Sequence, residues 1–159
     1  MCVLRFVRAQ ADALDADPLE IVWPVSPACD FDAILRRGNR ASAVVEVKSR
    51  DISLEDLEGY GSLLISKDKI DRCSVVSKTL GVPFVVFADL KDATLMWVVF
   101  RADGKKAFDY EVREQTTKNT CNDSTKKTEL CAFLSVEDAR TVGENKRVRS
   151  GVNRAVAPV

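Results

Sequence analysis

Residues 29–50 have the sequence CDFDAILRRGNRASAVVEVKSR, in which two runs of strand-forming residues flank the pair Gly38-Asn39. The first run covers residues 29–37 and the second covers residues 41–48. A Gly-Asn pair between two such runs is typical of a tight β-hairpin turn. The stretch therefore predicts a hairpin whose two strands lie side by side.

The second strand of this hairpin alternates valines with charged residues. Because side chains on a strand alternate between its faces, Glu46, Lys48 and Arg50 share one face. Val45 and Val47 share the other face, which is expected to point to the core. One interpretation is an α/β protein of unrelated function with an exposed sheet face, on which Glu46 and Lys48 are simply solvated.

Two aspartates on the first strand favour a metal site instead. Asp30 and Asp32 share one face by parity, and the turn brings their strand alongside Glu46. Carboxylates that converge from neighbouring strands repel each other unless a cation lies between them. Oxygen ligands of this kind suit Mg²⁺, which takes one or two protein carboxylates and keeps several waters. Asp30 is interpreted either as a further ligand or as an ordinary polar residue where the strand begins.

The composition excludes several kinds of active site. The chain of 159 residues contains no histidine, which removes Ser-His and Cys-His nucleophile pairs and HExxH zinc sites. Its five cysteines lack the spacing of zinc ligands, so free thiols in a reducing, cytoplasmic setting are expected. Lys plus Arg equals Asp plus Glu at 24 each. Attraction to a polyanion therefore has to come from local patches of charge.

The rest of the chain predicts a single domain over residues 1–141 and a flexible basic tail over residues 142–159. The expected helices are residues 3–15, a weak helix from Ser53 with a Ser53/Asp56 capping box, residues 67–80 between Ser66 and Gly81, and a short helix from Ser135. Further expected strands are residues 19–25, residues 83–90, a hairpin of residues 94–101 and 107–113 around Asp103-Gly104, and an edge strand over residues 130–134 after a loop at 114–128. One mixed sheet flanked by helices is the simplest α/β architecture that buries these elements.

Asp32, followed after a gap by Glu46-Val47-Lys48, resembles the PD-(D/E)XK signature of restriction-endonuclease-like nucleases and Holliday junction resolvases. Phe31 stands where the name-giving pattern has proline. Residues 64–86 are similar to the helix–strand unit that follows the motif in small phage and prophage members. The resemblance covers about residues 19–112. It implies an αβββαβ core with a mixed central sheet flanked by helices, with extra strands C-terminal to it.

The same resemblance implies a Mg²⁺-dependent nuclease, with Mn²⁺ as a substitute, that hydrolyses phosphodiester bonds in DNA. It assigns Asp32, Glu46 and the carbonyl of Val47 to the metal, and Lys48 to the attacking water or the transition state. An endonuclease acting on branched or replication intermediates is one form of this activity, and cutting both strands favours a homodimer. The alternative is a catalytically silent member that binds nucleic acid or a protein partner.

Three basic residues are the candidates for contacts with nucleic acid. Arg50 lies on the same face as Glu46 and suits either a phosphate or an ion pair with a nearby acid. Lys67 and Lys69 begin the long helix, where backbone N–H groups favour anions; the simpler interpretation is a solvated first turn. The basic tail either adds salt-sensitive affinity for phosphates or is unstructured surface.

Overall fold

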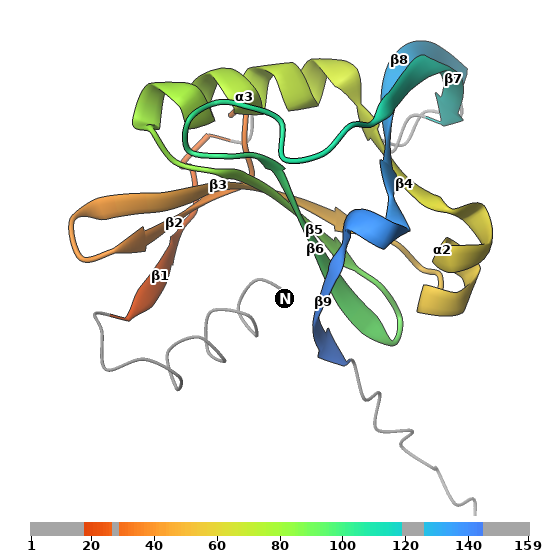
Figure 1. Cartoon of the computed structure of the whole chain (residues 1–159), viewed down its shortest axis with the longest axis horizontal. Helices are drawn as coiled ribbons and strands as arrows, with labels where there is room; N and C mark the ends of the chain where they lie inside the picture. Colours follow the sequence, from red (N-terminus) through yellow and green to blue (C-terminus); the bar gives the residue numbers. More distant parts are fainter. Residues whose placement is uncertain (1–17, 27–28, 119–125, 145–159) are drawn as a thin grey trace, which may run out of the picture.

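The computed structural model describes residues 18–26, 29–118 and 126–144, and in it one long helix lies across a twisted sheet (Figure 1). The elements in chain order are β1 (Leu19–Val22), β2 (Ala33–Arg37), β3 (Arg40–Ser49), α2 (Leu54–Tyr60), β4 (Ser62–Ser66), α3 (Lys67–Leu80), β5 (Phe84–Asp89), β6 (Ala93–Phe100), β7 (Glu111–Lys118), β8 (Lys126–Ser135), the 3₁₀ turn η1 (Val136–Asp138) and β9 (Arg140–Glu144).

The central sheet has six strands in the order β1-β2-β3-β5-β6-β9. Strands β3 and β5 are parallel, whereas the other neighbours are antiparallel. Parallel neighbours need a crossover connection, and here α2, β4 and α3 supply it. The chain is thus an α/β protein with a mixed central sheet flanked by helices, as predicted.

Apolar side chains are buried on both faces of this sheet. The α3 side holds the larger cluster, which includes Trp97, Phe84 and, from the helix, Ile70. The opposite face holds a smaller cluster with Val45 and Phe87 at its centre. The middle of β3, from Ala43 to Glu46, therefore runs between two apolar layers, and a charged side chain there is withdrawn from solvent.

The predicted hairpin around Gly38-Asn39 is confirmed by the pairing of β2 with β3. Gly38 has a φ of 52°, a left-handed value that a residue without a Cβ adopts at least cost. The first strand is shorter than predicted and begins at Ala33, so Asp30 and Asp32 lie in a bend before it. The ladder stops there because the Asp32 side chain, rather than a backbone carbonyl, accepts the N–H of Val47.

The predicted helices from Ser53 and Lys67 are both present. Ser53 and Asp56 form the predicted capping box of α2. Helix α3 has the predicted bounds and ends at Gly81, whose φ is 66°. In its last turn Leu80 is 44% exposed, and Ser77 is buried instead.

A second sheet, with the order β4-β8-β7, departs from the prediction. The expected hairpin of residues 94–101 and 107–113 is reduced to one bridge between Phe100 and Lys106, because β7 pairs with β8. Much of the expected loop at 114–128 is strand, and β8 is the middle strand rather than an edge. Strand β4 was not predicted at all, and it provides the partner that draws β8 away from the central sheet.

The sequence predicted a helix near one end of the chain and a basic tail at the other. The expected helix at 3–15 lies outside the described residues, as do residues 145–159 of the expected tail. Strand β9 pairs with β6 through Glu144, beyond the expected start of the tail at residue 142. No helix in the described part of the chain is long and apolar enough to cross a membrane.

Candidate metal and catalytic site

Glu46 lies on the face of β3 that α3 covers. It is 1% exposed. Its neighbours along the strand are also buried, Val44 on the same face and Val45 on the opposite one. The interpretation of a solvated Glu-x-Lys face is therefore wrong for Glu46. The physical reason is that helix α3 covers this face, so strand periodicity alone could not reveal the burial.

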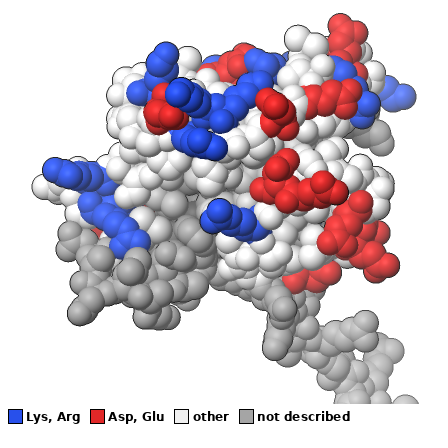
Figure 2. Space-filling view, in the orientation of Figure 1, with Lys and Arg blue, Asp and Glu red and all other residues white. Residues whose placement is uncertain are grey.

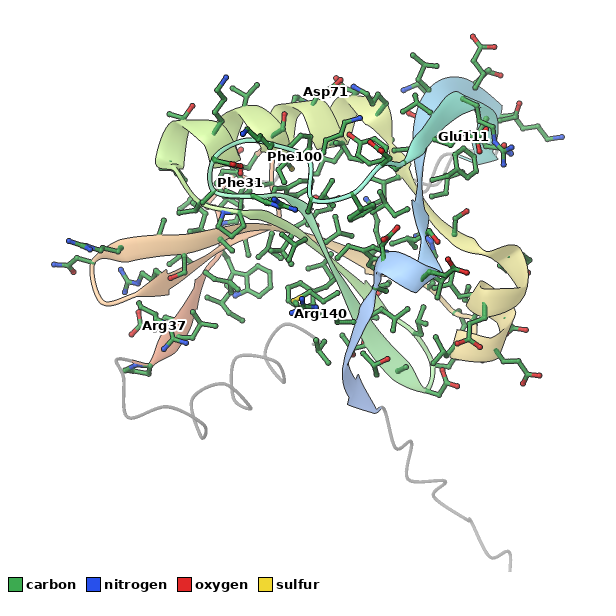
Figure 3. The ribbon with its side chains drawn as sticks, viewed as in Figure 1. Phe31, Arg37, Asp71, Phe100, Glu111 and Arg140 are labelled. Atoms are coloured by element: carbon green, nitrogen blue, oxygen red, sulfur yellow. The ribbon has the colours of Figure 1, made fainter. Side chains whose placement is uncertain are left out.

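Asp32 is fixed beside Glu46 by the start of the hairpin. Its backbone N–H donates to the carbonyl of Val45 at 3.0 Å, and its Oδ2 accepts the N–H of Val47 at 2.8 Å. Phe31, the preceding residue, packs against the core beneath α3 (Figure 3). An aromatic anchor thus holds the chain where the family pattern has proline.

Two lysines meet these carboxylates. Lys48 Nζ lies 2.6 Å from Oε1 of Glu46. Lys69 Nζ, from the first turn of α3, lies 3.0 Å from Oε2 of Glu46 and 3.6 Å from Oδ1 of Asp32. The two carboxylates therefore face one another across a single ammonium group.

The electrostatics of the group follow from its burial. Burial raises the pKa of Glu46, repulsion by Asp32 adds to the effect, and Lys48 and Lys69 oppose it. Burial by itself lowers the pKa of Lys69, but the attraction of Glu46 and Asp32 outweighs it and the pKa is raised. The carboxylate pair thus requires nearby positive charge, and Lys69 is held in its charged form.

Asp30 turns to the helix instead of to this pair. Its carboxylate lies 3.1 Å from Arg72 Nη1, and its carbonyl accepts a hydrogen bond from Cys73 Sγ at 3.1 Å. Burial raises the pKa of the Cys73 thiol to about 12, so this cysteine serves as a buried donor and not as a nucleophile. The arrangement matches the interpretation of Asp30 as an ordinary polar residue.

The other two basic candidates lie apart from the carboxylates. Lys67 forms an ion pair with Asp71 one turn along the helix. Arg50 follows β3, donates to the carbonyl of Ser49, and lines a groove of about 390 Å³ with Tyr60 and Arg113. Binding of nucleic acid by Arg50 and Lys67 stays a prediction.

The oxygens left at the site fit a divalent cation. The Val47 N–H donates to Oδ2 of Asp32, and Lys48 Nζ donates to Oε1 of Glu46. Oδ1 of Asp32 and Oε2 of Glu46 accept neither of these hydrogen bonds. Oε2 of Glu46 is buried without a hydrogen-bond partner in the described structure. Within residues 18–26, 29–118 and 126–144, no group of three or more acidic, histidine or cysteine side chains is arranged so that it could hold a metal ion. Two carboxylates nevertheless meet the requirement of Mg²⁺, which takes most of its ligands from water and substrate.

The position of Lys69 at the centre of the site is what the sequence interpretation missed. A helix returns to the same face after four residues, and Cys73, four residues after Lys69, is buried beside Ile70. That spacing places Lys69 next to the inward face of α3. The four-residue spacing from Lys69 to Cys73 is visible in the sequence. It indicates that Lys69 points inward, but it does not indicate which carboxylates Lys69 meets.

Surface charge near the site is divided between regions. Acidic side chains gather over α2, whereas Lys and Arg lie together with acidic side chains over α3 and over β7 and β8 (Figure 2). The acidic group on α2 comprises Glu55, Asp56 and Glu58, all exposed. The absence of net charge thus conceals local patches of both signs.

The hairpin, the mixed sheet and the helix across it form an α/β fold that is shared with a solved nuclease structure. The chain is similar in structure to Hjc, a Holliday junction resolvase from Archaeoglobus fulgidus, with a TM-score of 0.50 and 12% sequence identity. The match covers 89% of this chain and 94% of that one. No family model matches the sequence, and no curated protein matches it. The likeness establishes the fold.

Proposed function

We propose that this protein is a metal-dependent nuclease that hydrolyses phosphodiester bonds in DNA, acting as an endonuclease on branched or replication intermediates. The observation that carries the proposal is the convergence of Asp32, Glu46 and Lys48 at the open end of one hairpin. Likeness of fold to a Holliday junction resolvase supports the same activity.

In this proposal Asp32, Glu46 and the carbonyl of Val47 hold Mg²⁺, with Mn²⁺ as a substitute. When bound, the cation supplies a Lewis acid that acidifies water and neutralises charge on the scissile phosphate. Glu46 holds Lys48 at the site through the contact of 2.6 Å, and the side chain of Lys48 is still 26% exposed. Lys48 can therefore orient the attacking water or meet the negative charge that develops on the phosphate.

Contacts with the DNA backbone are assigned to Arg50, Lys67 and Lys69. Both lysines belong to the first turn of α3, and Lys69 reaches Asp32 from there. Phosphate contacts of this kind position a substrate without reading its base sequence. Cleavage of both strands by one site per chain favours a two-fold homodimer.

A catalytically silent module that binds nucleic acid or a protein partner is the second candidate. The position of Lys69 favours it, because an ammonium near both carboxylates compensates their charge without a metal. The two candidates differ in one property, which is metal-dependent hydrolysis.

The test is cleavage of linear, single-stranded, nicked and four-way DNA with Mg²⁺, Mn²⁺ or EDTA, comparing wild type with Glu46→Ala. Glu20→Ala is the matched control, since Glu20 is an exposed glutamate on β1 whose ion pair with Arg36 lies outside the site. Metal-dependent cutting by wild type and the control, lost in Glu46→Ala, supports the nuclease. Binding without cutting favours the silent module. If the folded protein neither binds nor cuts DNA, the result contradicts the nuclease and the nucleic-acid-binding form of the silent module.

A further inference from the structure

The carboxylate pair already has a cation between its members. Four carboxylate oxygens belong to Asp32 and Glu46, and two of them are engaged, by the Val47 N–H and by Lys48. The other two, Oδ1 of Asp32 and Oε2 of Glu46, are the atoms nearest to Lys69 Nζ, at 3.6 and 3.0 Å. The two carboxylate oxygens that accept no hydrogen bond from Val47 or Lys48 are thus the ones that Lys69 approaches.

We propose that the Lys69 ammonium is the resident counter-ion of the Asp32–Glu46 pair and that a divalent cation binds there only by displacing it. The inference rests on the metal site of the proposed function. A metal and an ammonium cannot share this position, because both carry positive charge and both draw on the same two oxygens. Lys69 therefore sets the cation concentration above which the site fills.

Displacement is physically open to this side chain. Lysine carries its charge on a flexible four-carbon stem, and Lys69 is 19% exposed, so its ammonium can move outward without leaving the first turn of α3. The side chain of Asp32 is 37% exposed, against 2% for Glu46. The site therefore opens towards solvent on the Asp32 side, which is the side from which a cation arrives.

The ammonium compensates the charge of Glu46 but leaves one of its buried oxygens without a hydrogen bond. Lys69 is within ion-pair distance of Glu46 Oε2, yet that oxygen has no hydrogen-bond partner of good geometry and is sealed from solvent. A buried carboxylate oxygen without a hydrogen bond is costly. A divalent cation relieves this cost more completely than the ammonium does, which gives displacement its driving force.

The experiment measures Mn²⁺ binding to the full chain by electron paramagnetic resonance and calorimetry, without nucleic acid. Lys69→Met removes the competing charge, and its affinity for Mn²⁺ is expected to be tighter by about ten-fold or more. Lys67→Met is the matched control, since it removes a charge from the same helical turn whose partner is Asp71. Lys69→Arg keeps the charge and is expected to bind Mn²⁺ about as wild type does.

An affinity of Lys69→Met within about two-fold of wild type, or a gain equal to that of Lys67→Met, overturns the proposal. If Lys69→Met fails to fold in EDTA, Mn²⁺ is expected to restore its circular dichroism, and failure to do so also overturns the proposal. Failure of the nuclease assignment is separate: tighter Mn²⁺ binding by Lys69→Met with no cleavage by any variant retains the counter-ion role and removes the nuclease. Cleavage by wild type with unchanged Mn²⁺ affinity in Lys69→Met retains the nuclease and removes the counter-ion role.

Discussion

The two ends of the β2–β3 hairpin hold the same chemistry in different surroundings. Near the turn, Arg36 and Glu20 approach to 2.7 Å with side chains 48% and 49% exposed. At the open end, Lys69 and Glu46 approach to 3.0 Å with side chains 19% and 2% exposed. Figure 3 labels Arg37 near the turn and Phe31 at the open end beneath α3.

Distance alone therefore does not distinguish a buried ion pair from a surface ion pair. Water surrounds the exposed pair and screens its charges, so the pair contributes little to the stability of the fold. At the open end α3 excludes water, the pKa of Glu46 rises mainly through burial, and the carboxylates depend on a nearby cation. The contrast between the ends predicts different responses to the removal of charge.

The largest difference is expected in activity. Asp32→Asn keeps the shape of the side chain but removes its charge. If Asp32 holds the metal as proposed, cleavage of the preferred substrate should fall by at least about 100-fold. Glu20→Gln makes the same change at the exposed end and should leave the rate unchanged. Single-turnover cleavage with Mg²⁺ measures both, and equal rates in the two variants would remove Asp32 from the site.

The next difference is expected in stability without metal. Lys69→Met leaves the buried Glu46 carboxylate with one counter-ion fewer, and the free energy of unfolding should fall by about 2–3 kcal/mol. Arg36→Met at the exposed end should change it by less than about 0.5 kcal/mol. Urea denaturation in EDTA measures both values. Similar values for the two variants would show that burial does not separate the ends.

The smallest effect is expected at the turn itself. Gly38 has a φ of 52°, and a Cβ in this conformation costs about 1 kcal/mol, so Gly38→Ala should lower stability by that amount. Cleavage at a saturating metal concentration should be unaffected, because the turn lies at the other end of the strands from Glu46. A loss of activity in a variant that remains folded would mean that the turn end also contributes to the site.

Local features of the sequence predicted the elements that carry the site. Gly38-Asn39 specifies the hairpin, the Ser53/Asp56 capping box starts α2, and Gly81 with Pro83 ends α3. Asp32, Glu46 and Lys48 could be selected because residue spacing and strand parity act within one hairpin. In each case the interacting residues are close along the chain.

The second sheet could not be predicted in the same way. Strand β4 has only five residues, directly before α3, and β7 is mostly exposed, so neither has a strong apolar period. Strand β8 pairs with β4 across about 70 residues of chain, a separation at which local turn signals carry no information. The predicted hairpin of residues 94–101 and 107–113 was wrong for this reason.

By itself, the sequence determined the hairpin, the bounds of α3 and the identity of the acidic pair, because backbone periodicity and turn chemistry act between near neighbours. Only the tertiary structure decided that Glu46 is buried and that Lys69 stands between Glu46 and Asp32. Both facts depend on the packing of α3 across β3, where residues more than 20 positions apart come into contact. Burial is set by what covers a surface, and the covering element belongs to another part of the chain.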